Sequence, residues 1–101
     1  MSELVRLNLI FPPALEDSVT EALVSEPAMP GFTLLQAEGH TGDFSRASAG
    51  ERVRGRVQRR VLWVVIERER LDEVLAVLRR EVASTDVRWW AEPVLAGGRL
   101  A

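Results

Sequence analysis

The chain has 101 residues, of which 47% are hydrophobic, and its formal net charge is −2. This size and composition predict one globular domain with its own core and argue against a disordered chain. The slight negative charge argues against a DNA-binding protein, and the absence of cysteine excludes disulfides and thiolate chemistry. No stretch approaches the roughly 20 apolar residues of a membrane span, and the first residues do not resemble a signal peptide. We therefore expect a soluble cytoplasmic protein that is not embedded in a membrane.

The first half of the chain predicts a strand, a helix and a second strand. Residues 3–11 alternate, so that the apolar members share one side of a strand: Val5, Leu7, Leu9 and Phe11. Two prolines then stop this strand, and residues 14–26 place apolar side chains at helical spacing. After the breaker cluster PAMPG, residues 31–40 predict the second strand.

The second half predicts a strand, a helix and a final strand. Residues 57–67 are rich in β-branched and aromatic residues, which favour strands. Residues 68–82 carry the single apolar stripe of an amphipathic helix. Residues 85–92 alternate again, and Pro93 is expected to end that strand. Residues 95–101 predict a flexible tail.

This order of elements predicts an α+β fold, the ferredoxin-like plait (βαββαβ). Two βαβ halves with right-handed crossovers form a four-stranded antiparallel sheet with both helices on one face. We expect a single domain of residues 1–94, with a long loop, residues 40–56, between the second and third strands. The tail then follows the domain.

The third predicted strand is apolar on both sides, although a plait covers only one sheet face with helices. Val61, Trp63 and Val65 share one side, and three further aliphatic residues share the other: Leu62, Val64 and Ile66. Leu4 and Ile10 of the first strand add to the uncovered face. Because a monomer rarely exposes so large an apolar patch, we expect a homo-oligomer. The alternative is that the C-terminal tail folds over this face.

The stretch from residue 46 to residue 60 is strongly basic, with six arginines and one glutamate. In an extended chain, alternate positions place four arginines on one side: Arg52, Arg54, Arg56 and Arg60. That side becomes apolar near residue 61, so the hairpin end is expected to project beyond the oligomer contact and carry the charge. Planar guanidinium groups suit a partner protein or a small anion. Nucleic acid and a solvated loop without a ligand stay open as alternatives, although Phe44 is the only aromatic residue of residues 40–56.

Several short motifs in a fixed order resemble those of a known superfamily. They are FPPALED at the end of the first strand, GF before the second, GH at 39–40, SAGERVRGR before the third, WW in the last strand and PVLAGGR at the end. The chain resembles the PII-like signalling proteins, and most closely a bacterial PII-like family of unknown function associated with heavy-metal efflux operons.

This resemblance implies a non-enzymatic regulatory protein. It implies a trimer, a small effector such as a nucleotide or a metal, and docking of loop 40–56 on a partner such as a transporter. It also implies that Arg99 reaches a neighbouring subunit's ligand. The turn EVASTDVR lacks the glycine and lysine with which nucleotide-binding PII proteins hold phosphates, and the chain has no tyrosine for covalent modification. The sequence does not name a cofactor.

The alternative function is a metal-binding protein of heavy-metal tolerance. His40 is the only histidine, and Glu38 and Asp43 lie close to it in sequence. A metal ion needs three or four such ligands, and copies around a three-fold axis could complete the set. A histidine at a strand end without any ligand is the simpler interpretation of the same pattern.

Trp90 is the last candidate. It shares its side with Arg88 and Glu92, so we expect an interface residue or, alternatively, a platform for stacking a ligand. An enzyme is the third hypothesis, but no set of histidine, carboxylate and nucleophile is evident. The one polar residue of a regular element that is expected to be buried is Asn8.

Overall fold

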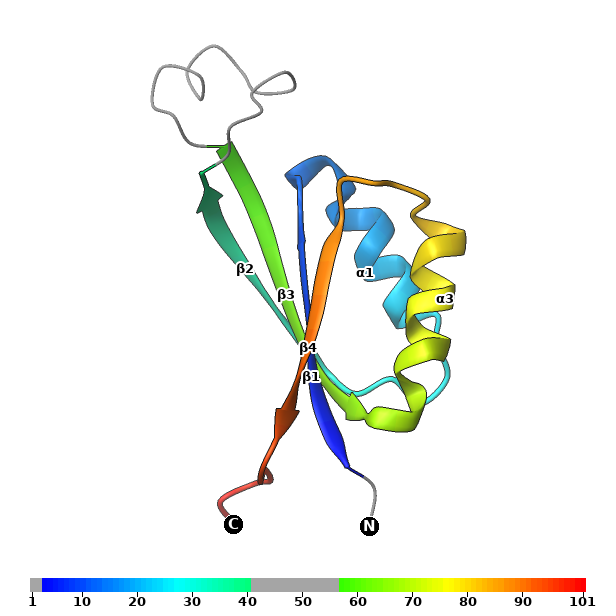
Figure 1. The fold of residues 1–101 in the computed structure, drawn as a ribbon, viewed down its shortest axis with the longest axis vertical. Helices are drawn as coiled ribbons and strands as arrows, with labels where there is room; N and C mark the ends of the chain where they lie inside the picture. The colour runs from blue at the N-terminus through cyan, green and yellow to red at the C-terminus, as the bar shows by residue number, and fades with distance from the viewer. Residues whose placement is uncertain (1–2, 41–56) are drawn as a thin grey trace.

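Four antiparallel strands and two helices make up the described part of the chain, residues 3–40 and 57–101 of the computed structural model (Figure 1). The strands are β1 (Leu4–Phe11), β2 (Phe32–Gly39), β3 (Val57–Glu67) and β4 (Arg88–Val94), and the helices are α1 (Glu16–Val24) and α3 (Leu71–Glu81). They follow the predicted order strand, helix, strand, strand, helix, strand. The α+β ferredoxin-like fold is therefore confirmed.

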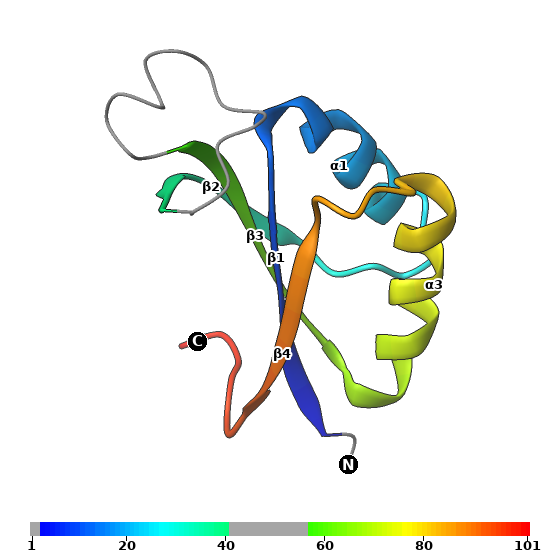
Figure 2. The same cartoon turned by 45° about the horizontal axis from the view of Figure 1, so that its top comes forward.

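The sheet has the strand order β2-β3-β1-β4, with every neighbouring pair antiparallel. Both helices lie on the same side of it, as Figure 1 and the turned view in Figure 2 show. No helix of residues 3–40 and 57–101 lies on the opposite face, so this part of the chain leaves the sheet with one covered face and one open face. The two central strands, β1 and β3, contribute to both faces along their whole length.

The core lies between the helices and the covered face. Odd positions of β1 and even positions of β3 point into it, because side chains alternate along a strand. The helices close it with apolar stripes at helical spacing. The core residues that are buried are Val5, Leu7, Leu9, Phe11, Val19, Ala22, Leu23, Leu62, Val64, Ile66, Val74, Leu75, Val77 and Leu78.

Both helices begin with a short 3₁₀ turn, Pro13–Leu15 before α1 and Arg68–Arg70 before α3. Acidic residues occupy the first turn of each α-helix, and α3 ends with Arg79 and Arg80. This arrangement of charges complements the helix dipole. No helix in the described ranges is long and apolar enough to cross a membrane.

The prediction that Pro93 ends the last strand is wrong. β4 runs on to Val94, and Pro93 lies opposite Val5 in the ladder with β1. The order of the sheet gives the reason. β4 is an edge strand, and a proline without an N–H group is tolerated where that position faces away from the neighbouring strand.

The structure also changes the interpretation of the alternating arginines. The even positions of β3 that follow them, Leu62, Val64 and Ile66, belong to the core beneath the helices and not to the open face. Arg60 lies on the same covered side, in the first part of β3, and forms an ion pair with Glu16 of α1. Arg60 therefore continues the covered side of β3 and not the open face on which an oligomer contact was expected.

Candidate functional site

The open face of the sheet carries the largest group of exposed apolar side chains on its regular elements. The ladders place Val61 opposite Ile10 and opposite Leu35, so all three share this face. Trp63 and Val65 continue it along β3 and are 37% and 40% exposed. This confirms that β3 has apolar residues on both faces. Patches of this kind on a folded chain mark interaction sites.

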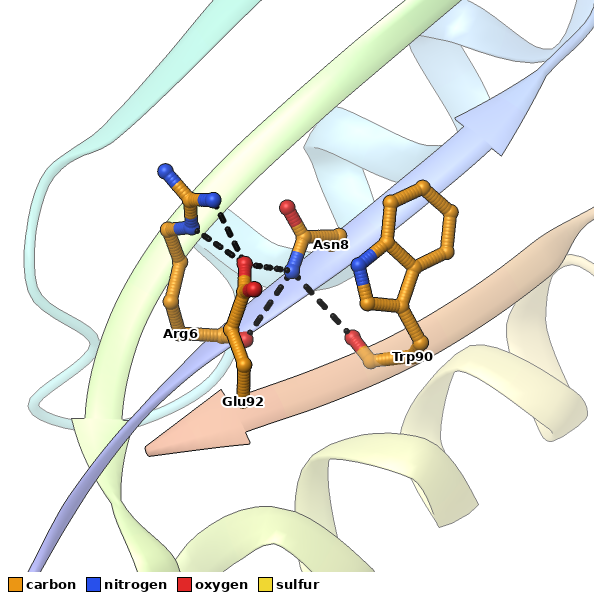
Figure 3. Close-up of polar contacts among 4 residues, drawn as sticks. All are labelled: Arg6, Asn8, Trp90 and Glu92. Atoms are coloured by element: carbon orange, nitrogen blue, oxygen red, sulfur yellow. Dashed lines mark hydrogen bonds and ion pairs between the residues drawn. The ribbon is translucent and has the colours of Figure 1, made fainter. Parts of the chain in front are cut away.

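A polar cluster occupies the middle of this apolar face (Figure 3). Arg6 of β1 lies directly opposite Glu92 of β4, and its Nε donates a hydrogen bond of 2.9 Å to Glu92 Oε1. Its Nη2 contacts the same oxygen. The guanidinium carbon of Arg6 also lies 4.8 Å from the centre of the Trp63 ring, which is cation–π geometry. One arginine thus joins three strands of the sheet.

Asn8 lies next to this pair and is fully buried, although it belongs to the open face. Its Nδ2 donates to Glu92 Oε1 at 3.0 Å, to the carbonyl oxygen of Arg6 at 3.1 Å, and to that of Trp90 at 3.4 Å. Its Oδ1 is buried and accepts no hydrogen bond within the described residues. A buried acceptor without a donor costs about 1–3 kcal/mol of folding free energy.

The electrostatics of the cluster follow from these contacts. The hydrogen bond from Arg6, followed by the one from Asn8, lowers the pKa of Glu92 below its ordinary value. The carboxylate is therefore ionised at neutral pH, and both Arg6 and Asn8 donate to its Oε1. Proton transfer is favoured by a pKa near neutrality, whereas the pKa of Glu92 is lowered. Its ionised carboxylate is instead suited to holding neighbouring strands and side chains in place.

Trp90 lies where the sequence predicted. It is directly opposite Asn8 on β4, and Trp63 is directly opposite Asn8 on β3. Trp90 is 47% exposed on the open face, while its neighbour Trp89, opposite the core residue Leu9, is 44% exposed on the other side. Adjacent residues of the same type thus mark the two faces of one strand.

Of the predicted arginine group, the structure describes Arg60. Its Nε donates to Glu16 Oε1 at 2.8 Å, so Arg60 fixes the start of α1 against the first part of β3. Three members of the group lie outside the described residues: Arg52, Arg54 and Arg56. Their role as a binding site stays a prediction.

The structure describes two of the three predicted metal ligands. Glu38 lies near the end of β2, and His40 follows that strand directly. Asp43 lies outside the described residues. Within residues 3–40 and 57–101, no three histidine, aspartate or glutamate side chains are grouped as metal ligands. The metal site therefore stays a prediction.

Two further features concern the predicted nucleotide effector. Arg99 lies in the exposed segment that follows β4, in which Leu95 and Leu100 are fully exposed. The turn between α3 and β4 contains Ala83 with φ 49°, a left-handed conformation that glycine favours. The backbone there takes the shape of a glycine turn without having a glycine.

A second polar cluster fixes the turn between α1 and β2. Arg70 donates to the carbonyl oxygens of Pro27 at 2.9 Å and Ala28 at 3.2 Å, and lies near the carboxylates of Glu26 and Glu73. A hydrogen bond to Glu73, together with burial, raises the pKa of Glu26. Arg70 contacts two backbone carbonyl oxygens and two carboxylates. This cluster therefore serves to hold the turn between α1 and β2 in place.

The roles of Arg6 and Glu92 were not predicted from the sequence. Alternation already places Arg6 and Asn8 on the side of β1 away from the core, and the plait topology places β1 between β3 and β4. Two polar residues in the middle of a central strand, opposite a glutamate on the next strand, were a usable signal. The pairing register was needed to bring them together.

The comparisons with known proteins agree with this fold. A family model described as "Protein of unknown function (DUF3240)" matches residues 1–101, so the chain belongs to that family. The crystal structure of a DUF3240 family protein from Shewanella baltica OS155 is similar over 100% of both chains, with a TM-score of 0.81 and 19% sequence identity. No curated protein matches the chain.

Two more distant structures share the fold. The Bacillus subtilis GlnK–ATP complex has a TM-score of 0.70 and 13% identity, over 93% of this chain and 84% of that one. A Bacillus cereus protein related to NIF3 also has a TM-score of 0.70 and 13% identity, over 94% of this chain but 26% of that one. The chain thus has the fold of the PII-like proteins, within a family of unknown function, as its motifs predicted.

Proposed function

We propose that this protein is a non-enzymatic regulatory module of the PII-like kind. In this proposal it assembles as a homotrimer through the open sheet face and binds a small effector in the cytoplasm. It presents residues 40–56 to a partner protein such as a metal-efflux transporter. The effector is a nucleotide or a metal ion, and its binding changes the order of the presented segment.

The observation that carries this proposal is the β2–β3 ladder. It runs without interruption to the pair of Gly39, the last residue of β2, and Val57, the first residue of β3. Both ends of segment 40–56 therefore leave the sheet side by side from a rigid two-stranded base. Loops of this length inside a compact domain are commonly functional. Arg59 lies at that base and favours a partner with an acidic surface, whereas Arg60 beside it is paired with Glu16.

The arrangement also supports a separation of roles. In this proposal the oligomer contact uses the open face, whereas the helices occupy the other face (Figure 2). Gly39 and Val57, which flank the segment, are paired at one end of the sheet. Assembly and docking thus use different surfaces. A trimer would present three copies of the segment and multiply weak contacts with one partner.

Native mass spectrometry of the purified chain with ATP, ADP, Zn²⁺, Cu²⁺, Co²⁺ or Ni²⁺ tests this proposal. We expect a trimer that binds one of these ligands and that melts at a higher temperature when the ligand is present. Arg99→Ala should weaken binding of a nucleotide, and His40→Ala should weaken binding of a metal. A trimer that binds none of these ligands would contradict the effector role. Unchanged metal binding by His40→Ala would contradict the site of His40, Glu38 and Asp43.

A further inference from the structure

Asn8 occupies an unusual position for a polar residue. It is the one buried polar or charged side chain in the described ranges, and it lies at the centre of the open face. Trp63 and Trp90 flank it from the two neighbouring strands, and Arg6 and Glu92 lie beside it. An open sheet face would be expected to leave its central side chain in contact with solvent. Here the surrounding side chains cover Asn8 instead.

The hydrogen bonds of Asn8 do not balance within one chain. Its Nδ2 has two hydrogens and faces three acceptors, while its Oδ1 accepts nothing from the described residues. The chain therefore bears the desolvation of an acceptor that it does not satisfy. Oδ1 is therefore an acceptor without a donor, and Nδ2 faces more acceptors than it has hydrogens. The hydrogen bonds of Asn8 are incomplete in a single copy of the chain.

The fold itself does not require an amide at this position. The backbone of β1 is held by its ladders to β3 and β4, and Arg6 pairs with Glu92 without Asn8. An apolar residue between two tryptophans would remove the unsatisfied acceptor and bury more apolar surface. Within the folded monomer, the benefit of asparagine is limited to the hydrogen bonds of its Nδ2, and its Oδ1 contributes none within the described residues.

We propose that Asn8 is the residue that fixes how copies of this chain associate through the open face. In this proposal a second copy covers the face and supplies a hydrogen-bond donor to Oδ1 of Asn8. Other arrangements of the same apolar surfaces leave that acceptor unsatisfied and are disfavoured. A single buried asparagine sets register and oligomer state in this way in coiled coils. The inference rests on the homo-oligomer proposed above.

The chemistry of the face favours a second copy as its occupant. The charges in its centre neutralise each other, because Arg6 is paired with Glu92. A phosphate-bearing ligand at this centre would need a cation that is not already paired, and the other arginines of the face lie away from Asn8, Arg88 opposite Ile10 and Arg59 opposite Ala37. An apolar centre with paired charges complements another copy of itself. Trp63 and Trp90 flank Asn8 and are 37% and 47% exposed, so a second copy packed on this face would contact both of them. In the proposal, that contact shifts the two side chains and opens Oδ1 of Asn8 to the donor.

Asn8→Leu tests this inference, with Gln36→Leu as the matched control. Gln36 lies on β2 opposite Arg60, on the covered side of the sheet, and is exposed. Native mass spectrometry and light scattering over a range of protein concentrations give the distribution of oligomers. We expect one oligomeric mass for the wild type and for Gln36→Leu, and more than one mass, or a different mass, for Asn8→Leu. The melting temperature of Asn8→Leu should be equal to that of the wild type or higher.

The outcomes distinguish the role of Asn8 from the homotrimer proposed above. A trimer with the same mass and concentration dependence in Asn8→Leu would overturn the role of Asn8 and leave the trimer intact. A wild type that is monomeric at all concentrations would overturn both. If Asn8→Leu does not fold, Asn8→Val asks the same question with a smaller, β-branched side chain.

A second arm tests nucleic acid as an alternative occupant of the face. The wild type is titrated with a single-stranded oligothymidylate while tryptophan fluorescence is recorded. Quenching in a monomeric protein that is lost in Trp90→Ala would assign the face to single-stranded nucleic acid and overturn the inference. We expect no quenching.

Discussion

The two faces of the same sheet differ in how their apolar residues are covered. On the covered face, residues such as Leu62 and Val64 are buried completely by helices of their own chain. On the open face, Trp63 and Val65 alternate with them along the same strand and remain more than a third exposed. The difference shows that the helices of the chain cover one side of β3 and leave the apolar residues of its other side partly exposed.

The difference extends to polar groups. The covered face excludes them from its centre, and its ion pair of Arg60 with Glu16 lies at the margin. The open face has Arg6, Asn8 and Glu92 in its centre, with one acceptor unsatisfied. A core is selected for stability alone, whereas an interface also needs specificity, for which polar groups are suited.

The largest expected effect is on the covered face. Leu62→Ala removes a fully buried side chain and should lower the free energy of unfolding by about 2–5 kcal/mol. Urea denaturation at a low and at a high protein concentration measures it. The loss of folding stability should be similar at both concentrations, because the helices that cover Leu62 belong to the same chain. Val65→Ala is the control on the open face and should have a smaller effect that grows with concentration.

The next effect concerns the open face. Trp63→Asp places a charge where a second copy is expected to pack and should leave a folded monomer. Trp90→Ala should weaken association by about 2 kcal/mol, roughly 30-fold in the dissociation constant, if Trp90 is a central contact. Trp89→Ala, one residue away on the other face, is the matched control. Sedimentation velocity measures the association, and equal effects of the two alanine variants would contradict the assignment of faces.

A smaller effect is expected at a turn that belongs to neither face. Ala83→Gly relieves a left-handed backbone conformation with φ 49° and should stabilise the fold by about 0.5–1 kcal/mol. The melting temperature should rise by a few degrees in both the oligomer and a monomeric variant. A decrease would show that the alanine methyl group makes a contact that outweighs the strain.

The smallest effect is on pH dependence. The pKa of Glu92 is lowered in the folded state, so its pair with Arg6 contributes stability above the ordinary glutamate pKa of about 4.3. That contribution is lost as the pH falls through the lowered value. Glu92→Gln should therefore melt below the wild type at pH 7, and the difference should shrink as the pH falls below about 4. A difference that stays constant over this range would contradict the ion pair.

The sequence predicted most of the fold because each element has a strong local pattern. The limits of β3 agree with the prediction, and the alternation of β1 identifies its core residues. Pro93 was misjudged because its tolerance depends on β4 being an edge strand, which is a property of the whole sheet. The end of that strand was predicted from its local pattern, which carries no information on which strand lies at the edge, although the predicted plait topology does.

The candidate site was predicted less well. Asn8 was recognised as a polar residue expected to be buried, and Trp90 was placed on the correct side of its strand. The pair of Arg6 with Glu92 joins residues that are 86 positions apart, so it depends on the pairing register. The pairing of Arg60 with α1 could likewise be predicted only from knowledge of which face of β3 the helices cover. Long-range geometry of this kind does not follow from spacing along the chain.

The mass of the wild-type protein in solution tests the central claim most directly. Light scattering at micromolar concentration distinguishes one copy of 11.3 kDa from an assembly of three. The account predicts about three times the mass of the single chain, and a shift towards the mass of one chain in Trp63→Asp. A wild type that remains at 11.3 kDa as its concentration rises would contradict the claim that the open face is covered by copies of this chain.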